Sequence, residues 1–192
     1  MRSFIGSTLV VVGLAVLPSL ILAQRRVAAR TDAHAGAQYE FGVDLGADYA
    51  KPSSVNGVST SGGIELLTPV DIRVGFRSRG KLMWEPRVSL GLTTWGGATR
   101  DMIGLGVAGL YAMEPGGHSS GMYLTGGAGL VLVNNGVNSG TNFSIGGGVG
   151  WRKPFGSAAW RYELGFRYDT KNDAYLPATI RIGGRVGLSL WH

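Results

Sequence analysis

Apolar and polar residues alternate with a period of two along most of the chain after residue 37. Between positions 39 and 49, apolar side chains at the odd positions alternate with Glu40, Asp44, Asp48 and glycines at the even positions. Successive side chains of a β-strand point to opposite faces of the sheet, so such a segment has one apolar face and one face of charges and glycines. Eight segments follow this pattern and are predicted to be strands: 38–50, 63–77, 82–95, 101–113, 121–134, 142–152, 158–170 and 178–192.

The links between these segments are short and rich in Gly, Pro, Asn and Ser, which join neighbouring antiparallel strands. No helical periodicity follows Ala23. Eight strands in simple sequential order predict an all-β fold, an eight-stranded antiparallel up-and-down barrel. Closure of the barrel removes the exposed edges that such an apolar sheet would otherwise present to other chains.

Two orientations of this barrel are compatible with the alternation. With the apolar face inward, it would be a soluble, lipocalin-like ligand binder, and its outer face should carry many Lys, Glu and Thr side chains. The polar face instead combines Gly and Ser with a limited set of Arg and carboxylate residues. An uncharged band of Leu, Val, Ile and aromatic residues on the outside, with the charges inside, is typical of a transmembrane barrel. We therefore predict a transmembrane barrel.

Aromatic residues cluster near strand ends, as they do where a barrel crosses the two membrane interfaces. If both termini lie in the periplasm, one such belt lies at the periplasmic interface. Its predicted members are Tyr39, Phe41, Phe76, Trp84, Tyr111, Tyr123, Trp151, Trp160, Tyr162 and Trp191.

The first residues form a separate segment. Arg2 precedes an apolar stretch, Leu9–Ala23, which resembles an export signal. We predict a signal peptide over residues 1–23, a flexible arm over 24–36 and the barrel over 37–192. The alternative is a retained helical anchor, because Phe4–Ala23 is about long enough to span a bilayer.

Composition excludes several classes of function. The chain has no Cys, which excludes disulfides, zinc–thiolate sites and thiol catalysis. The net charge is +6, but the sequence has neither a basic stripe nor a recognition motif, so nucleic acid is not a predicted partner. The chain has 33 glycines, and those within the alternating segments indicate tight curvature or close backbone approach.

The charged parity of the strands predicts an ion-pair network inside the barrel. Because closure places the first strand between the second and the eighth, Glu40 is expected to meet Arg77, Asp44 to meet Arg73 or Arg185, and Asp48 to meet Arg181. The three stacked acids could instead form a calcium site, since Ca²⁺ takes carboxylate ligands. The predicted network comprises Glu40, Asp44, Asp48, Glu65, Asp71, Arg73, Arg77, Glu85, Arg87, Arg161, Glu163, Arg167, Arg181 and Arg185.

The last segment, Ile180–His192, alternates apolar residues up to an aromatic residue near the chain end. With the barrel pattern over Tyr39–His192, it resembles the small eight-stranded outer-membrane barrels of the outer membrane protein A and X type. The resemblance implies a location in the outer membrane of a Gram-negative-type bacterium and contact with membrane lipids, including lipopolysaccharide. It also implies assembly by the outer-membrane barrel assembly machinery, and a role in envelope integrity or surface interaction.

Some barrels of this size modify lipid A as deacylases or acyltransferases, so an enzyme is the competing hypothesis. Acyl hydrolysis needs a nucleophile, a base and an orienting group that converge. The three histidines, His34, His118 and His192, fall in the arm, in a periplasmic turn and at the chain end. We therefore predict a monomeric, non-catalytic barrel without cofactor or metal, whose lumen is filled by charged side chains.

Overall fold

The computed structural model describes residues 39–54, 61–78, 80–95, 98–113, 120–134, 139–172 and 176–191, without the side chains of 65–70, 92–95 and 98–100. The predicted signal peptide and arm lie outside these residues. The eight strands are β1 (Tyr39–Pro52), β2 (Gly63–Arg77), β3 (Leu82–Trp95), β4 (Ala98–Ala112), β5 (Gly121–Asn134), β6 (Ser139–Phe155), β7 (Ala158–Asp169) and β8 (Thr179–Trp191).

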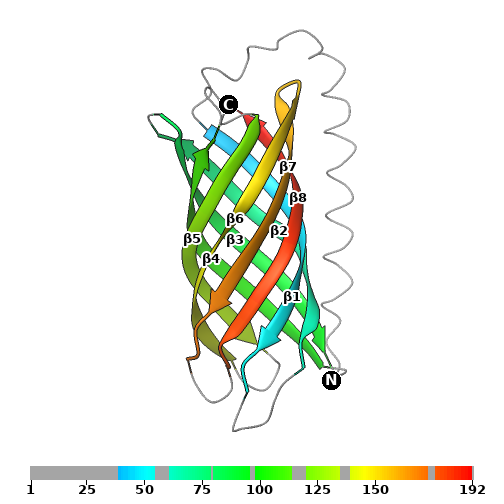
Figure 1. Cartoon of the computed structure of the whole chain (residues 1–192). Helices are drawn as coiled ribbons and strands as arrows, with labels where there is room; N and C mark the ends of the chain where they lie inside the picture. Colours follow the sequence, from blue (N-terminus) through cyan, green and yellow to red (C-terminus); the bar gives the residue numbers. More distant parts are fainter. Residues whose placement is uncertain are drawn as a thin grey trace.

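Each strand pairs antiparallel with its neighbour in the chain, and β1 pairs with β8, so the sheet is a closed barrel (Figure 1). β1 begins and β8 ends at the same end of the barrel, here called the terminal end; the opposite end is the loop end. The predicted eight-stranded up-and-down fold is confirmed. Within the described residues, no helix is both long and apolar enough to span a membrane.

Two strands have boundaries that differ clearly from the prediction. β4 begins at Ala98 rather than at residue 101, and β6 runs from Ser139 to Phe155 rather than from 142 to 152. At its end, β6 continues through Lys153 and Pro154 because the turn to β7 needs only Gly156 and Ser157. Gly156 has a φ of 59°, a left-handed conformation that glycine adopts without steric cost.

The orientation of side chains distinguishes the two possible barrels. Large apolar side chains such as Ile64 and Leu164 are 68% and 62% exposed on the outer surface. Most charged side chains of the strands point inward, and Glu40, Arg73 and Glu85 are all 0% exposed. A water-soluble protein has the opposite distribution. The barrel therefore presents an apolar surface to a membrane and a polar lumen to its own axis.

Inward-facing glycines allow the sheet to curl into so narrow a barrel. A Cβ atom on Gly148 would lie 2.3 Å from the carbonyl oxygen of Leu164, and one on Gly129 would lie 2.5 Å from that of Leu105. Real Cβ atoms do not approach backbone so closely. These positions therefore need glycine because neighbouring strands come close together on the concave face.

An irregularity in β2 lies beside the site described below. The β1–β2 register moves from Asp44 opposite Asp71 to Gly46 opposite Leu67, so one residue of β1 faces three residues of β2. β2 therefore carries two additional residues. Because the side-chain period of a strand is two, an insertion of two residues keeps the charged parity directed at the lumen.

Candidate functional site

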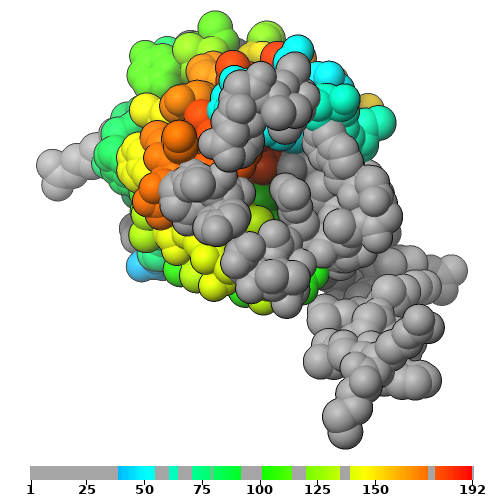
Figure 2. All heavy atoms as spheres, turned by 90° about the horizontal axis from the view of Figure 1, so that it is seen from below, coloured from blue at the N-terminus to red at the C-terminus, as the bar shows by residue number. Residues whose placement is uncertain are grey.

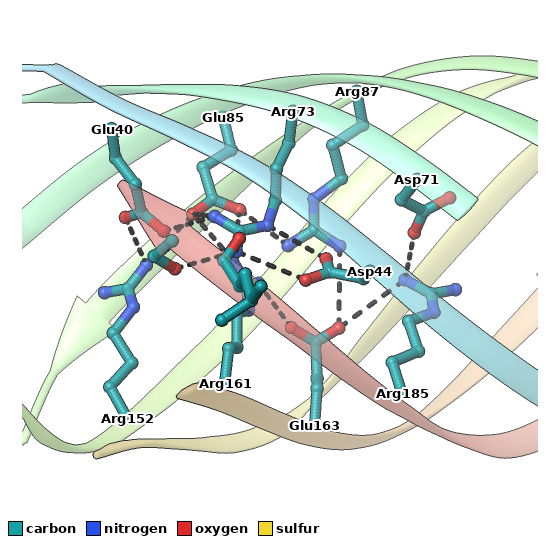
Figure 3. A network of polar contacts seen from close by, with 12 residues as sticks. Glu40, Asp44, Asp71, Arg73, Glu85, Arg87, Arg152, Arg161, Glu163 and Arg185 are labelled. Atoms are coloured by element: carbon teal, nitrogen blue, oxygen red, sulfur yellow. Dashed lines mark hydrogen bonds and ion pairs between the residues drawn. The ribbon is translucent and has the colours of Figure 1, made fainter. Parts of the chain in front are cut away.

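The terminal half of the lumen is organised around the carboxylate of Glu85, which β3 directs toward the barrel axis. Arg161 Nη1 lies 2.9 and 3.0 Å from the two carboxylate oxygens of Glu85. Arg87 Nη2 lies 2.9 Å, Arg152 Nη2 3.1 Å and Arg73 Nη1 3.6 Å from the same carboxylate. One fully buried acid thus contacts four guanidinium groups from four strands (Figure 3).

Arg73 connects Glu85 to the two acids of β1. Its Nε donates to Asp44 Oδ2 at 2.9 Å, its Nη1 binds the carboxylate of Glu40, and its Nη2 donates to Ser189 Oγ at 2.9 Å. Glu40 also accepts from Arg152 Nη2 at 2.7 Å. Because β6 lies across the barrel from β1, the Glu40–Arg152 pair spans the lumen (Figure 3).

Aromatic rings pack against the guanidinium groups at the terminal end. The ring centroid of Tyr123 lies 4.8 Å from Arg152 Cζ and 5.0 Å from Arg161 Cζ, and the ring centroid of Trp191 lies 5.3 Å from Arg152 Cζ. Contacts of this kind stabilise a cation on a ring face. Met83 and Leu110, both 0% exposed, complete an apolar cluster with Tyr123 and Trp191. Charged and apolar side chains together fill this half of the lumen.

Toward the loop end, the network continues through Glu163. Its carboxylate lies 3.5 Å from Arg87 Nη1 and 3.6 Å from Arg185 Nη1, and it accepts from Tyr123 Oη at 3.2 Å. Arg185 Nη1 also lies 2.8 Å from Asp71 Oδ2. The network labelled in Figure 3 contains five carboxylates (Glu40, Asp44, Asp71, Glu85 and Glu163) and five guanidinium groups (Arg73, Arg87, Arg152, Arg161 and Arg185), so its formal charge is zero.

A cavity of about 110 Å³ lies beside this network, between Arg87, Asp71 and Glu163 on one side and the glycine-rich wall of β4, β5 and β6 on the other. Figure 2, which looks along the barrel from the loop end, shows the coloured strands arranged around the barrel axis. Among the described residues, Asp71 Oδ1 and Arg87 Nε have no hydrogen-bond partner. A polar cavity of this size accommodates water molecules.

A second group of ion pairs lies nearer the loop end. Asp169 binds the guanidinium group of Arg181, and its Oδ1 lies 3.1 Å from Arg167 Nε. Arg167 Nη2 also lies 3.8 Å from the sulfur of Met102, which packs inside the barrel against Val131.

The structure places most of the predicted network residues in the lumen. Glu40, Asp44, Asp48, Asp71, Arg73, Glu85, Arg161, Glu163 and Arg181 are buried, and Arg77, Arg87, Arg167 and Arg185 are half-buried. The side chain of Glu65 lies outside the described part.

The expected partners are met only in part. Asp44 pairs with Arg73, one of its two expected partners. Glu40, expected to meet Arg77, contacts Arg73 and Arg152, and Arg185 contacts Asp71 and Glu163.

Sequence reasoning missed three residues that belong to these networks, Arg152, Asp169 and Ser189, and it placed a fourth, Tyr123, in the outer aromatic belt. Arg152 has the same parity as Gly148 and Gly150, and this parity already placed it inside the barrel. Because Arg152 stands beside Lys153 and near a turn, it was not assigned to the lumen in spite of this parity. Tyr123 shares the parity of Thr125 and Gly127 in β5, so alternation could also have placed its ring inside.

Eight of the ten predicted belt aromatics are on the outer surface, with exposed fractions between 40% and 53%: Tyr39, Phe41, Phe76, Trp84, Tyr111, Trp151, Trp160 and Tyr162. The prediction for Tyr123, which is 2% exposed and packs in the lumen, is wrong. The prediction for Trp191 is also wrong. This residue is 7% exposed and lies in the lumen, since it has the inward parity of Arg185, Gly187 and Ser189.

Two of the three acids considered for a calcium site already have arginine partners. Glu40 and Asp44 are engaged by arginines, and no group of three His, Asp or Glu residues there could hold a metal ion. The three histidines, His34, His118 and His192, lie outside the described residues.

No protein-family model and no curated protein matches the chain. Solved structures are similar in fold. Neisserial surface protein A superimposes with a TM-score of 0.51 at 11% identity, over 80% of this chain and 97% of that chain. The N-terminal β-barrel domain of OprF from Pseudomonas aeruginosa gives 0.48 at 15% identity, over 80% and 100%. The chain has the fold of the small eight-stranded outer-membrane β-barrels.

Proposed function

We propose that this chain is a monomeric, non-catalytic integral protein of the outer membrane of a Gram-negative-type bacterium. Its role is envelope integrity, or surface interaction through the segments at the loop end, and it is not a channel. The observation that carries the proposal is the neutral network around Glu85, which fills the terminal half of the lumen together with Tyr123 and Trp191. A lumen of eight strands has room for packed side chains but not for a wide aqueous path.

The physical cost of opening the lumen supports a structural role. Breaking a buried ion pair by removing one partner costs about 3–5 kcal/mol. Glu85 alone contacts four arginines, so a path past it requires several such contacts to break together. The same contacts hold β2, β3, β6 and β7 in one register, which suits a scaffold that displays loops.

Planar-bilayer recording of the refolded barrel tests this function. We expect no sustained conductance steps at voltages and protein amounts at which a general porin, recorded in parallel, conducts readily. Stable porin-sized steps from the wild-type chain would overturn the proposal.

The role in the envelope and the enzymatic alternative are tested in cells. A strain that lacks the chain should become more sensitive to detergent or bind its surface partners less, and expression of the chain should restore the phenotype. The mass spectrum of lipid A should be identical with and without overexpression. A new acylated or deacylated lipid A species that depends on the chain would identify an enzyme instead.

A further inference from the structure

The outer surface at the terminal end of β6 and β7 carries a lysine set among aromatic rings. Outward-facing residues of this hairpin pair in rows: Trp151 lies opposite Tyr162, and Lys153 lies opposite Trp160. The rings of Trp151 and Tyr162 are stacked with centroids 6.1 Å apart, and those of Phe155 and Trp160 with centroids 5.7 Å apart. Lys153 therefore lies between two stacked aromatic pairs, at the level where such rings meet lipid headgroups.

The ammonium group of Lys153 is not used within the barrel. Its side chain is exposed and makes no hydrogen bond or ion pair with any residue that the structure describes. Lys81, on the β2–β3 link at the same end, is different. Its Nζ lies 5.8 Å from the ring centroid of Tyr111 and donates to the carbonyl oxygen of Met113 at 3.3 Å.

An apolar groove of about 370 Å³ on the membrane-facing surface begins at the Trp151–Tyr162 row, one row from Lys153. Trp151 and Tyr162 border it next to Lys153, and Leu164, Gly184 and Val186 continue it toward the middle of the barrel. Gly184 faces outward, and a Cβ atom there would meet nothing closer than the carbonyl oxygen of Glu163 at 3.8 Å. The missing side chain of Gly184 is thus part of what makes the surface concave.

We propose that this surface binds one anionic glycerophospholipid of the leaflet at the terminal end. Its phosphate binds the Lys153 ammonium group, and one acyl chain lies in the groove over Gly184. The charge of Lys153 selects an anionic headgroup, and the apolar lining of the groove receives the acyl chain. In the orientation predicted from the sequence, with the start of β1 and the end of β8 on the periplasmic side, this lipid belongs to the inner leaflet of the outer membrane.

The experiment measures which lipid stays with the barrel. Wild-type protein and variants are refolded into vesicles of equimolar phosphatidylglycerol and phosphatidylcholine, extracted in mild detergent and weighed by native mass spectrometry. We expect the wild type to retain one phosphatidylglycerol with about fivefold preference, the size of one lysine's attraction to an anionic lipid. Lys153→Gln should abolish the preference, and Lys153→Arg should keep it.

Filling the groove separates the acyl-chain contact from the charge. Gly184→Leu should reduce retention of both lipids, whereas Gly126→Leu should not, because Gly126 is an outward-facing glycine away from the groove. Lys81→Gln is the matched control for charge and should behave as the wild type. Heat-dependent gel mobility verifies that each variant is folded. Equal retention of the two lipids by the wild type, or losses in the two controls as large as in Lys153→Gln and Gly184→Leu, would overturn the proposal.

Discussion

At the scale of single residues, buried charges determine how this lumen is built. The carboxylate of Glu85 contacts four guanidinium groups at once, and the guanidinium group of Arg73 contacts three carboxylates. A buried carboxylate or guanidinium group is tolerated only when partners replace the hydration that it loses. Each member of the network therefore depends on the others, and the loss of one leaves its partners uncompensated.

Removing the charge of Glu85 should destabilise the barrel strongly. Glu85→Gln leaves the network with a formal charge of +1, and we expect the free energy of unfolding to fall by about 3–5 kcal/mol. Urea titration of the protein refolded in lipid vesicles measures the change. The exposed Asp101, on the outer parity of β4, provides the control, and Asp101→Asn should change stability by less than about 0.5 kcal/mol. Equal effects of the two substitutions would contradict the role of Glu85.

A double-mutant cycle should reveal the ion pair between Asp71 and Arg185. Their atoms approach to 2.8 Å, and we expect the double alanine variant to recover about 1–3 kcal/mol relative to the sum of the single losses. Asp44 and Arg185, which no ion pair joins in the described part of the lumen, should show a smaller coupling. The same urea titration yields both cycles. Additive losses for Asp71 and Arg185 would rule out the pair.

At the scale of elements, alternation was enough to predict all eight strands, because the two faces of each strand meet such different surroundings. Alternation also places Trp191 inside the barrel, because this residue has the same parity as Arg185. Its place at a strand end favours the outer belt instead, but the parity is the signal that agrees with the structure. The strand boundaries of β4 and β6 were less predictable, since turn residues such as Pro154 can also pair at the edge of a sheet.

Glycines on the two faces of the sheet should respond differently to the same substitution. Gly148→Ala places a Cβ atom against the backbone of Leu164, and overpacking of this kind costs about 1–3 kcal/mol. Gly126→Ala, where the nearest atom would be 3.9 Å away, should be neutral or slightly stabilising, since alanine restricts the unfolded chain. The midpoint of the heat-dependent gel shift compares the two variants. A larger loss for Gly126→Ala would contradict the explanation by curvature.

At the scale of the whole molecule, the partners inside the lumen could not be predicted from neighbouring strands alone. Arg152 reaches Glu40 across the barrel, from β6 to β1. Such contacts depend on the stagger of the strands and on the length of each side chain, which parity does not encode. The sequence therefore predicted which residues face inward, but only some of the pairs that they form.

The distribution of the charges among the strands bears on how the barrel closes between β1 and β8. Within the Figure 3 network, β2, β3 and β7 each contribute one acid and one arginine, whereas β1 contributes two acids, and β6 and β8 one arginine each. The imbalance of −2 on β1 is cancelled by +1 from β6 and +1 from β8. Before closure, β1 at one margin of the sheet carries an excess charge of −2 and β8 at the other margin carries +1, and pairing β1 with β8 brings these opposite charges together. The charges of the strands therefore favour closure of the barrel.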